Sequence, residues 1–94
     1  TWSDISGTVL EYDHEMLVDT PQGEVLVGMG QSSYVESQGF AASAGDRVTV
    51  RGFDEDGEFK AGVVQNLTTG AAITLRDQDG RPMWAGNGKG QNRQ

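Results

Sequence analysis

The stretch from Gln31 to Phe40, QSSYVESQGF, is the strongest helix candidate in a chain whose other segments mostly alternate apolar and polar residues. Ser33 and Glu36 have the spacing of a capping box. In that motif the hydroxyl and the carboxylate each accept a hydrogen bond from the other residue's backbone N–H, which defines where a helix begins. The pattern therefore predicts one short helix between two groups of strands.

The end of this helix is predicted at Gly39, because glycine takes the left-handed conformation without steric cost. Phe40 then packs back on Val35, as in a Schellman ending. A helix covering about residues 34–38 is too short to be stable alone. We expect Tyr34, Val35 and Phe40 to hold it against the rest of the molecule.

Six segments around this helix have the period-two alternation that is typical of strands. Both faces of the first segment carry apolar residues, which predicts a long strand that serves both halves of a barrel and bends at Gly7. In the fifth segment Phe59, Ala61 and Val63 alternate, and the pattern shifts after Val64, as a β-bulge would cause. The predicted strands cover residues 1–12, 16–20, 24–30, 47–53, 58–67 and 72–76.

Three strands, one helix and two strands is the element order of the OB fold, a five-stranded Greek-key barrel. We predict an all-β domain with one short helix, a β-β-β-α-β-β barrel plugged by that helix, and a small C-terminal strand or hairpin. An SH3-like barrel is the alternative, since it has similar strands but no capped helix at this point. Residues 1–85 are assigned to this single domain, and residues 86–94, GNGKGQNRQ, are expected to be a disordered tail or linker.

The run from VLVGMG through YVESQGF to GDRVTVRGFDEDGEFKAGVV resembles bacterial OB-fold domains. Such domains are found in small periplasmic or secreted proteins, the stress-tolerance type among them. The resemblance covers roughly residues 4–67 and rests on the pattern of strands and helix. It implies the OB fold and favours a periplasmic or secreted setting, and it carries no catalytic residue over to this chain.

The charge of the chain bears on its partners. Fourteen Asp and Glu residues against seven Lys and Arg give a net charge of −7, which argues against nucleic acids and anionic membranes as ligands. The absence of Cys excludes disulfides and thiolate chemistry. No apolar run approaches the length of a membrane span, and no segment has the pattern of a signal peptide. The first residue is Thr1 rather than Met, so we expect a processed chain or a piece of a larger protein.

Strands two and three with their adjacent loops form the usual ligand face of OB folds, which here is residues 13–30. This span contains no Phe, Tyr, Trp, Lys or Arg. Single-stranded nucleic acid needs aromatic platforms and basic groups, so its binding is disfavoured. The candidate ligand-face residues are His14, Glu15, Leu17, Asp19, Glu24 and Leu26.

Two stretches, residues 54–57 and 77–80, read D-x-D-G, the core of a calcium loop. Both lack a third acidic ligand and the late bidentate Glu of such loops. We favour tight turns, because Asp-Gly supplies the positive φ angles that a two-residue hairpin turn needs. We expect no dedicated metal site, and weak divalent-cation binding by Asp54, Asp56 and Glu58 remains as an alternative.

His14 is the only His, and no Ser lies in the glycine pattern of a nucleophile elbow. We therefore predict no catalytic residues, no enzyme activity and no cofactor. The leading hypothesis is a noncatalytic, monomeric OB-fold module of a larger bacterial protein that binds a protein partner or a small extended ligand. The alternative is a small-molecule or divalent-cation-binding barrel that uses its acidic loops.

Overall fold

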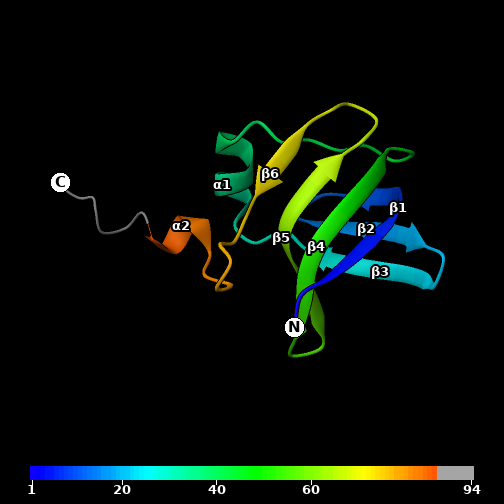
Figure 1. Ribbon diagram of the computed structural model, residues 1–94. Coiled ribbons are helices and arrows are strands. Elements are labelled where there is room, and N and C mark those ends of the chain that lie inside the picture. Colours follow the sequence, from blue (N-terminus) through cyan, green and yellow to red (C-terminus); the bar gives the residue numbers. More distant parts are fainter. Residues whose placement is uncertain (87–94) are drawn as a thin grey trace.

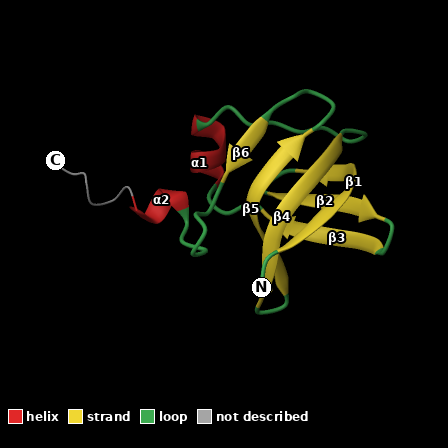
Figure 2. Cartoon of the chain, viewed as in Figure 1, coloured by secondary structure: helices red, strands yellow, loops and turns green. Residues whose placement is uncertain are grey.

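The computed structural model describes residues 1–86 and shows a closed five-stranded β-barrel with one additional strand and two short helices (Figure 1). Strands dominate, and both helices lie at the side of the barrel where β6 lies (Figure 2). The elements are β1 (Ser3–Tyr12), β2 (Glu15–Thr20), β3 (Gly23–Gly28), α1 (Ser32–Ser37), β4 (Arg47–Glu55), β5 (Glu58–Asn66), β6 (Ala72–Thr74) and α2 (Met83–Gly86). The predicted fold class, an OB-like all-β barrel with one short helix after the third strand, is confirmed.

The barrel closes through a parallel contact between β3 and β5, in which Val27 pairs with Phe59. All other neighbouring strands are antiparallel, in the order β3-β2-β1-β4-β5. β6 adds to the other half of β5, and a bridge between Arg76 and Pro82 forms the expected C-terminal hairpin. Most of the predicted tail lies outside the described residues.

β1 serves both halves of the barrel, as predicted, because its first half pairs with β4 and its second half with β2. Gly7 lies where β2 comes closest: a Cβ atom there would be 2.1 Å from the carbonyl oxygen of Asp19. The irregularity in the strand lies further on, between Val9 and Glu11. Gly7 is thus required by the close approach of two backbones.

The core is a layer of small branched side chains closed by a few larger ones. Its fully or nearly fully buried members are Val9, Met16, Val18, Val27, Met29, Val35, Phe40, Val48, Val50, Phe59, Ala61, Val64, Ile73 and Leu75.

One detail of the pattern predicted for the fifth strand is wrong. Gly62 has no partner in the β4–β5 register, so the alternation of inward and outward residues shifts at Gly62 rather than after Val64. As a result Val63 is only half-buried, and Val64 is the buried residue.

Helix α1 begins earlier than predicted. Its N-cap is Gln31, whose backbone is extended and whose carbonyl accepts the Val35 N–H at 3.1 Å. Ser33 therefore lies inside the helix, and no side chain caps it, so the predicted capping box is wrong. The predicted ending is confirmed: Gly39 has φ +73°, and the Phe40 N–H donates to the Val35 carbonyl in the Schellman pattern.

Neither helix within residues 1–86 has the length and apolar composition needed to span a bilayer.

Candidate functional site

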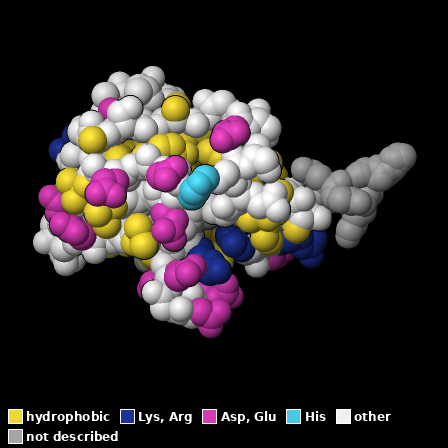
Figure 3. All heavy atoms as spheres, turned by 180° about the vertical axis from the view of Figure 1, so that it is seen from behind, with side chains coloured by type: hydrophobic (Ala, Val, Ile, Leu, Met, Phe, Trp, Pro, Cys, Tyr) yellow, Lys and Arg dark blue, Asp and Glu magenta, His cyan; other side chains and the backbone are white. Residues whose placement is uncertain are grey.

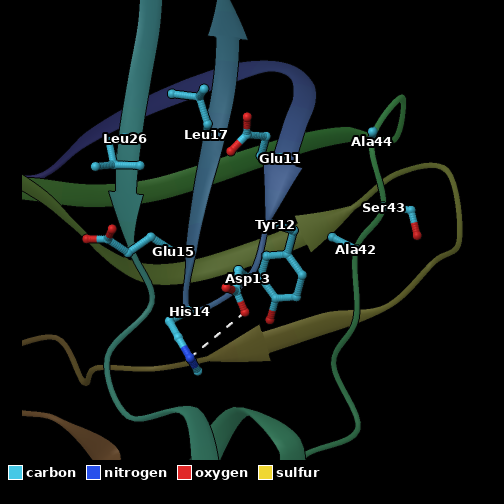
Figure 4. Close-up of a pocket in the computed structure, with 10 residues that line it drawn as sticks. All are labelled: Glu11, Tyr12, Asp13, His14, Glu15, Leu17, Leu26, Ala42, Ser43 and Ala44. Atoms are coloured by element: carbon cyan, nitrogen blue, oxygen red, sulfur yellow. Dashed lines mark ion pairs between the residues drawn. The ribbon is translucent and has the colours of Figure 1, made fainter.

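A groove of about 670 Å³ runs over the outer face of β1, β2 and β3, beside the loop that follows α1 (Figure 4). The two strands β2 and β3 form its floor, and loop residues 42–44 form the facing wall. Its lining residues are Glu11, Tyr12, Asp13, His14, Glu15, Leu17, Leu26, Ala42, Ser43 and Ala44. The groove therefore lies on the face where OB folds usually bind ligands.

The floor is apolar. Leu17 and Leu26 are directly opposite each other in the β2–β3 ladder, and both point outward into the groove. Leu26 is 52% exposed, and Leu17 is half-buried. A ligand that covers these paired leucines removes apolar surface from water, which favours binding.

The rim is acidic. The carboxylates of Glu11, Asp13 and Glu15 line the groove, and no Lys or Arg of the described part of the chain does. Figure 3 shows this face with the single histidine among carboxylates and apolar side chains. A groove with an apolar floor and a negatively charged rim attracts a cationic ligand that also carries apolar groups.

The wall of the groove is fixed by Asn66, which is 1% exposed at the end of β5. Its side-chain nitrogen donates to a carboxylate oxygen of Asp46 at 2.9 Å. The same carboxylate oxygen accepts the backbone N–H of Ser43 at 2.9 Å. This chain of hydrogen bonds holds the loop that forms the wall against the barrel.

Two groups near the groove have shifted pKa values. The hydrogen bond from Asn66, together with the Ser43 N–H, holds the pKa of Asp46 below its usual range, since both stabilise the carboxylate. Burial raises the pKa of the Tyr12 hydroxyl, and the negative charge of Glu36 raises it further. Tyr12 therefore presents a neutral hydroxyl to the groove at neutral pH.

Four of the six predicted ligand-face residues, His14, Glu15, Leu17 and Leu26, line the groove. The other two, Asp19 and Glu24, pair with each other further along the same two strands, outside the lining. The loop wall, Glu11 and Tyr12 were missed, because their proximity to the strands of the floor depends on how the barrel closes.

His14 is exposed in the turn between β1 and β2, and its Nδ1 atom lies 2.7 Å from the Ser32 hydroxyl. Its Nε2 atom is 3.9 Å from a carboxylate oxygen of Asp13, beyond hydrogen-bond distance. Ser32 is the first residue of α1, and the side chains of His14 and Asp13 are 76% and 90% exposed. A hydrolase triad instead has a buried carboxylate that orients the histidine through a short hydrogen bond. We assign this group a surface role in joining the β1–β2 turn to α1.

Both acidic stretches form turns, and the first adopts the predicted backbone with positive φ at Asp and Gly. Asp56 and Gly57 have φ of 56° and 82°, as in a type I′ hairpin, and Glu58 lies 3.8 Å from the Lys60 ammonium. In the second turn the Asp77 carboxylate accepts the N–H groups of Asp79 and Arg81. Across residues 1–86, no group of three or more His, Cys, Asp or Glu side chains is arranged to hold a metal ion.

No protein-family profile, curated protein or solved structure matches this chain. The structure therefore supports the OB-like barrel by its own geometry, and a membership in a bacterial OB-fold family has no support from a match.

Proposed function

We propose that this protein is a noncatalytic OB-like binding module that holds an extended, basic segment of a partner protein in the groove over β1, β2 and β3. The observation that carries the proposal is the outward-facing Leu17–Leu26 pair in a groove that the carboxylates of Glu11, Asp13 and Glu15 also line. An extended segment that alternates basic and apolar residues would place its apolar side chains on the leucines. Its basic side chains would then point away from the floor, and their long aliphatic stems would let the ammonium groups bend back to the carboxylates of the rim.

The edge of β3 favours an extended ligand over a compact one. In the described part of the chain β3 contacts β5 only through Val27 and Gly28, so residues 23–26 are paired on one side alone. Such an edge accepts an added strand through backbone hydrogen bonds. Because Leu26 lies on this strand, an added strand and the groove floor would be contiguous.

Nucleic acid is a poorer fit for the same groove. Among the described residues, Tyr12 is the one aromatic residue in its lining, and it is half-buried, while the lining contains Asp and Glu but no Lys or Arg. Phosphates would be repelled, and bases would lack a stacking platform. The wider context, a module of a larger bacterial protein in a periplasmic or secreted setting, is part of the proposal and rests on the sequence pattern.

The proposal is tested by calorimetric titration with an acetylated, amidated hexapeptide of alternating Lys and Val. We expect binding that weakens with added salt, because the rim charges are exposed and therefore screened. The same peptide with Glu in place of Lys should not bind. A Lys peptide and a Glu peptide that bind equally well would overturn the proposal.

Two pairs of matched variants locate the binding. Leu26→Asn should weaken binding about fivefold to tenfold, as expected for removing a half-buried leucine contact. Leu67→Asn is its control, because Leu67 is 58% exposed and lies outside the groove. Glu15→Gln should also weaken binding, whereas Asp56→Asn, at the tip of the β4–β5 hairpin, should not. Equal losses in a variant and its control would show that the peptide does not use the groove.

A further inference from the structure

A second feature lies away from the groove, where three aromatic and two cationic side chains form a continuous stack. The guanidinium of Arg51 lies 5.9 Å from the ring centre of Trp2, and Trp2 meets Phe53 edge-on at 5.1 Å. The guanidinium of Arg76 then lies 5.5 Å from Phe53 and 5.7 Å from Trp84. The stack joins the start of the chain, β4 and α2, and it fixes the position of the Arg76 guanidinium.

Among the described residues, Arg76 differs from its cationic neighbours in having no carboxylate partner. Arg51 is paired with Asp4 at 3.1 Å, and Lys60 lies near Glu55 and Glu58 at 3.6 and 3.8 Å. Within residues 1–86 no ion pair involves Arg76, whose guanidinium donates to the Gly80 carbonyl at 2.9 Å. Arg76 is half-buried, and a guanidinium carries five N–H donors, so a half-buried one favours an anionic partner.

A cavity of about 350 Å³ opens beside Arg76, and its lining is Trp2, Arg51, Val63, Arg76, Asp77 and Gln78. This lining holds two basic side chains and one acidic one, the reverse of the acidic groove. The acidic one, Asp77, already accepts two backbone N–H groups within its own turn. Trp2 lies against Gly62, where a Cβ atom would be 2.4 Å from the indole ring, so the indole is seated close to the barrel wall.

We propose that this cavity is a binding site for a carboxylate carried on an aromatic group, separate from the groove. The carboxylate would be held by Arg76 with Arg51 beside it, because a guanidinium presents paired N–H donors that match a carboxylate. The aromatic group would lie against the indole of Trp2 and the side chain of Val63. The fixed position of Arg76 between two rings reduces the entropy that is lost when the anion binds.

The test is an NMR titration of the full chain with benzoate, using benzamide as the neutral ligand of the same shape. We expect benzoate to shift the side-chain Nε–H peak of Arg76 and the indole N–H peak of Trp2 saturably, and benzamide to shift them at least about tenfold more weakly. Equal shifts by the two ligands, or benzoate shifts confined to other residues, would overturn the proposal.

Variants then assign the contact to named side chains. Arg76→Gln should weaken benzoate binding about tenfold or more, and Arg51→Gln should weaken it by a smaller factor, because Arg51 is shared with Asp4. Arg76 also contacts Trp84 of α2, so its substitution could weaken binding by displacing α2. Within residues 1–86 Arg51 has no such contact, so Arg51→Gln tests the charge at the cavity separately. Unchanged benzoate affinity in both variants would contradict the assignment.

The source of the carboxylate is decided by comparing benzoate with acetyl-glycyl-phenylalanine, which carries a peptide C-terminal carboxylate next to an aromatic side chain. Tighter binding of this dipeptide assigns the site to a protein C-terminus. Tighter binding of benzoate assigns it to a free aromatic acid. The amide of the dipeptide should bind more weakly than the acid, and equal binding of the two would count against a carboxylate site.

Discussion

At the scale of single residues, Asn66 is the residue on which the wall of the groove depends most. Its side-chain nitrogen donates to the Ala41 carbonyl and to the Asp46 carboxylate, and its oxygen accepts the N–H groups of Thr68 and Thr69. One buried amide therefore joins the loop before β4 to the turn after β5. Buried polar groups that lose their partners are costly, so this position tolerates little change.

Asn66→Ala is expected to lower the free energy of unfolding by about 2–4 kcal/mol, since it removes four hydrogen bonds that join the loop before β4 to the turn after β5. Gln65→Ala is the control at the neighbouring, exposed position, and it should change stability by about 0.5 kcal/mol or less. Urea denaturation of both variants measures this. Similar small losses in the two would show that the Asn66 hydrogen bonds contribute little.

Asp46 gives the loop wall a dependence on pH. Its pKa is lowered in the folded protein, so its contribution to stability is fully present above the unfolded value of 3.8 and is lost as the pH falls through the folded value. Wild type should therefore be more stable than Asp46→Asn at pH 7. The difference should shrink steadily in urea melts taken below about pH 4. A difference that is constant with pH would argue against a role for the ionised carboxylate.

The structural role of Asn66 could not be predicted from the sequence. An Asn before a Thr-Thr-Gly turn is typical of an exposed strand end. Asn66 points inward because the unpaired Gly62 shifts the alternation of inward and outward residues in β5. The residues before Gly62 do not reveal where this shift occurs. By contrast, the outward positions of Leu17 and Leu26 follow from simple alternation, so these groove residues could be predicted.

At the scale of elements, helix α1 depends on its C-terminal end more than on its N-terminal end. Gly39→Ala should destabilise the protein by about 1 kcal/mol, because a Cβ atom is strained at φ +73° although nothing lies within 4 Å of it. Ser33→Ala should cost about 0.5 kcal/mol or less, because Ser33 caps nothing. Thermal melts of the two variants measure these losses of stability. A larger loss of stability for Ser33→Ala than for Gly39→Ala would indicate that Ser33 does cap the helix.

The two ends of this helix also show what local sequence can specify. The Schellman ending could be predicted because it needs one glycine and one apolar contact, and both lie within six residues of sequence. The start could not, because the N-cap residue Gln31 makes no side-chain capping hydrogen bond that local sequence would reveal. Its position is set by the path from β3, and the short helix is held by packing of Val35 and Phe40 in the core.

At the scale of the whole molecule, closure of the barrel depends on glycines where backbones meet. Gly7→Ala should destabilise by at least about 2 kcal/mol, because its Cβ would overlap a backbone carbonyl that cannot rotate away. Gly28→Ala is the control, since its nearest contact would be an ordinary 3.7 Å. Urea denaturation should separate the two variants clearly, and equal stability would mean that β1 and β2 can move apart at little cost.

The barrel could be predicted because the number of strands and the position of the helix follow from local alternation and turns, and that element order is the order of the OB fold. The complete groove could not be, because its wall comes from residues 42–44 and its floor from residues 15–28, and the closed barrel alone brings them together. The cavity beside Arg76 likewise joins segments from the start, the middle and the end of the described chain.

The most direct test of the central claim is a two-dimensional amide NMR titration of the labelled protein with the acetylated, amidated Lys-Val hexapeptide. We predict shifts that cluster in the strands of the groove floor and in residues 42–44, with the peaks of Leu17 and Leu26 among the largest. Residues around the cavity of Trp2 and Arg76 should not shift. Shifts spread evenly over the acidic surface, or absent from β2 and β3, would contradict a binding groove on this face.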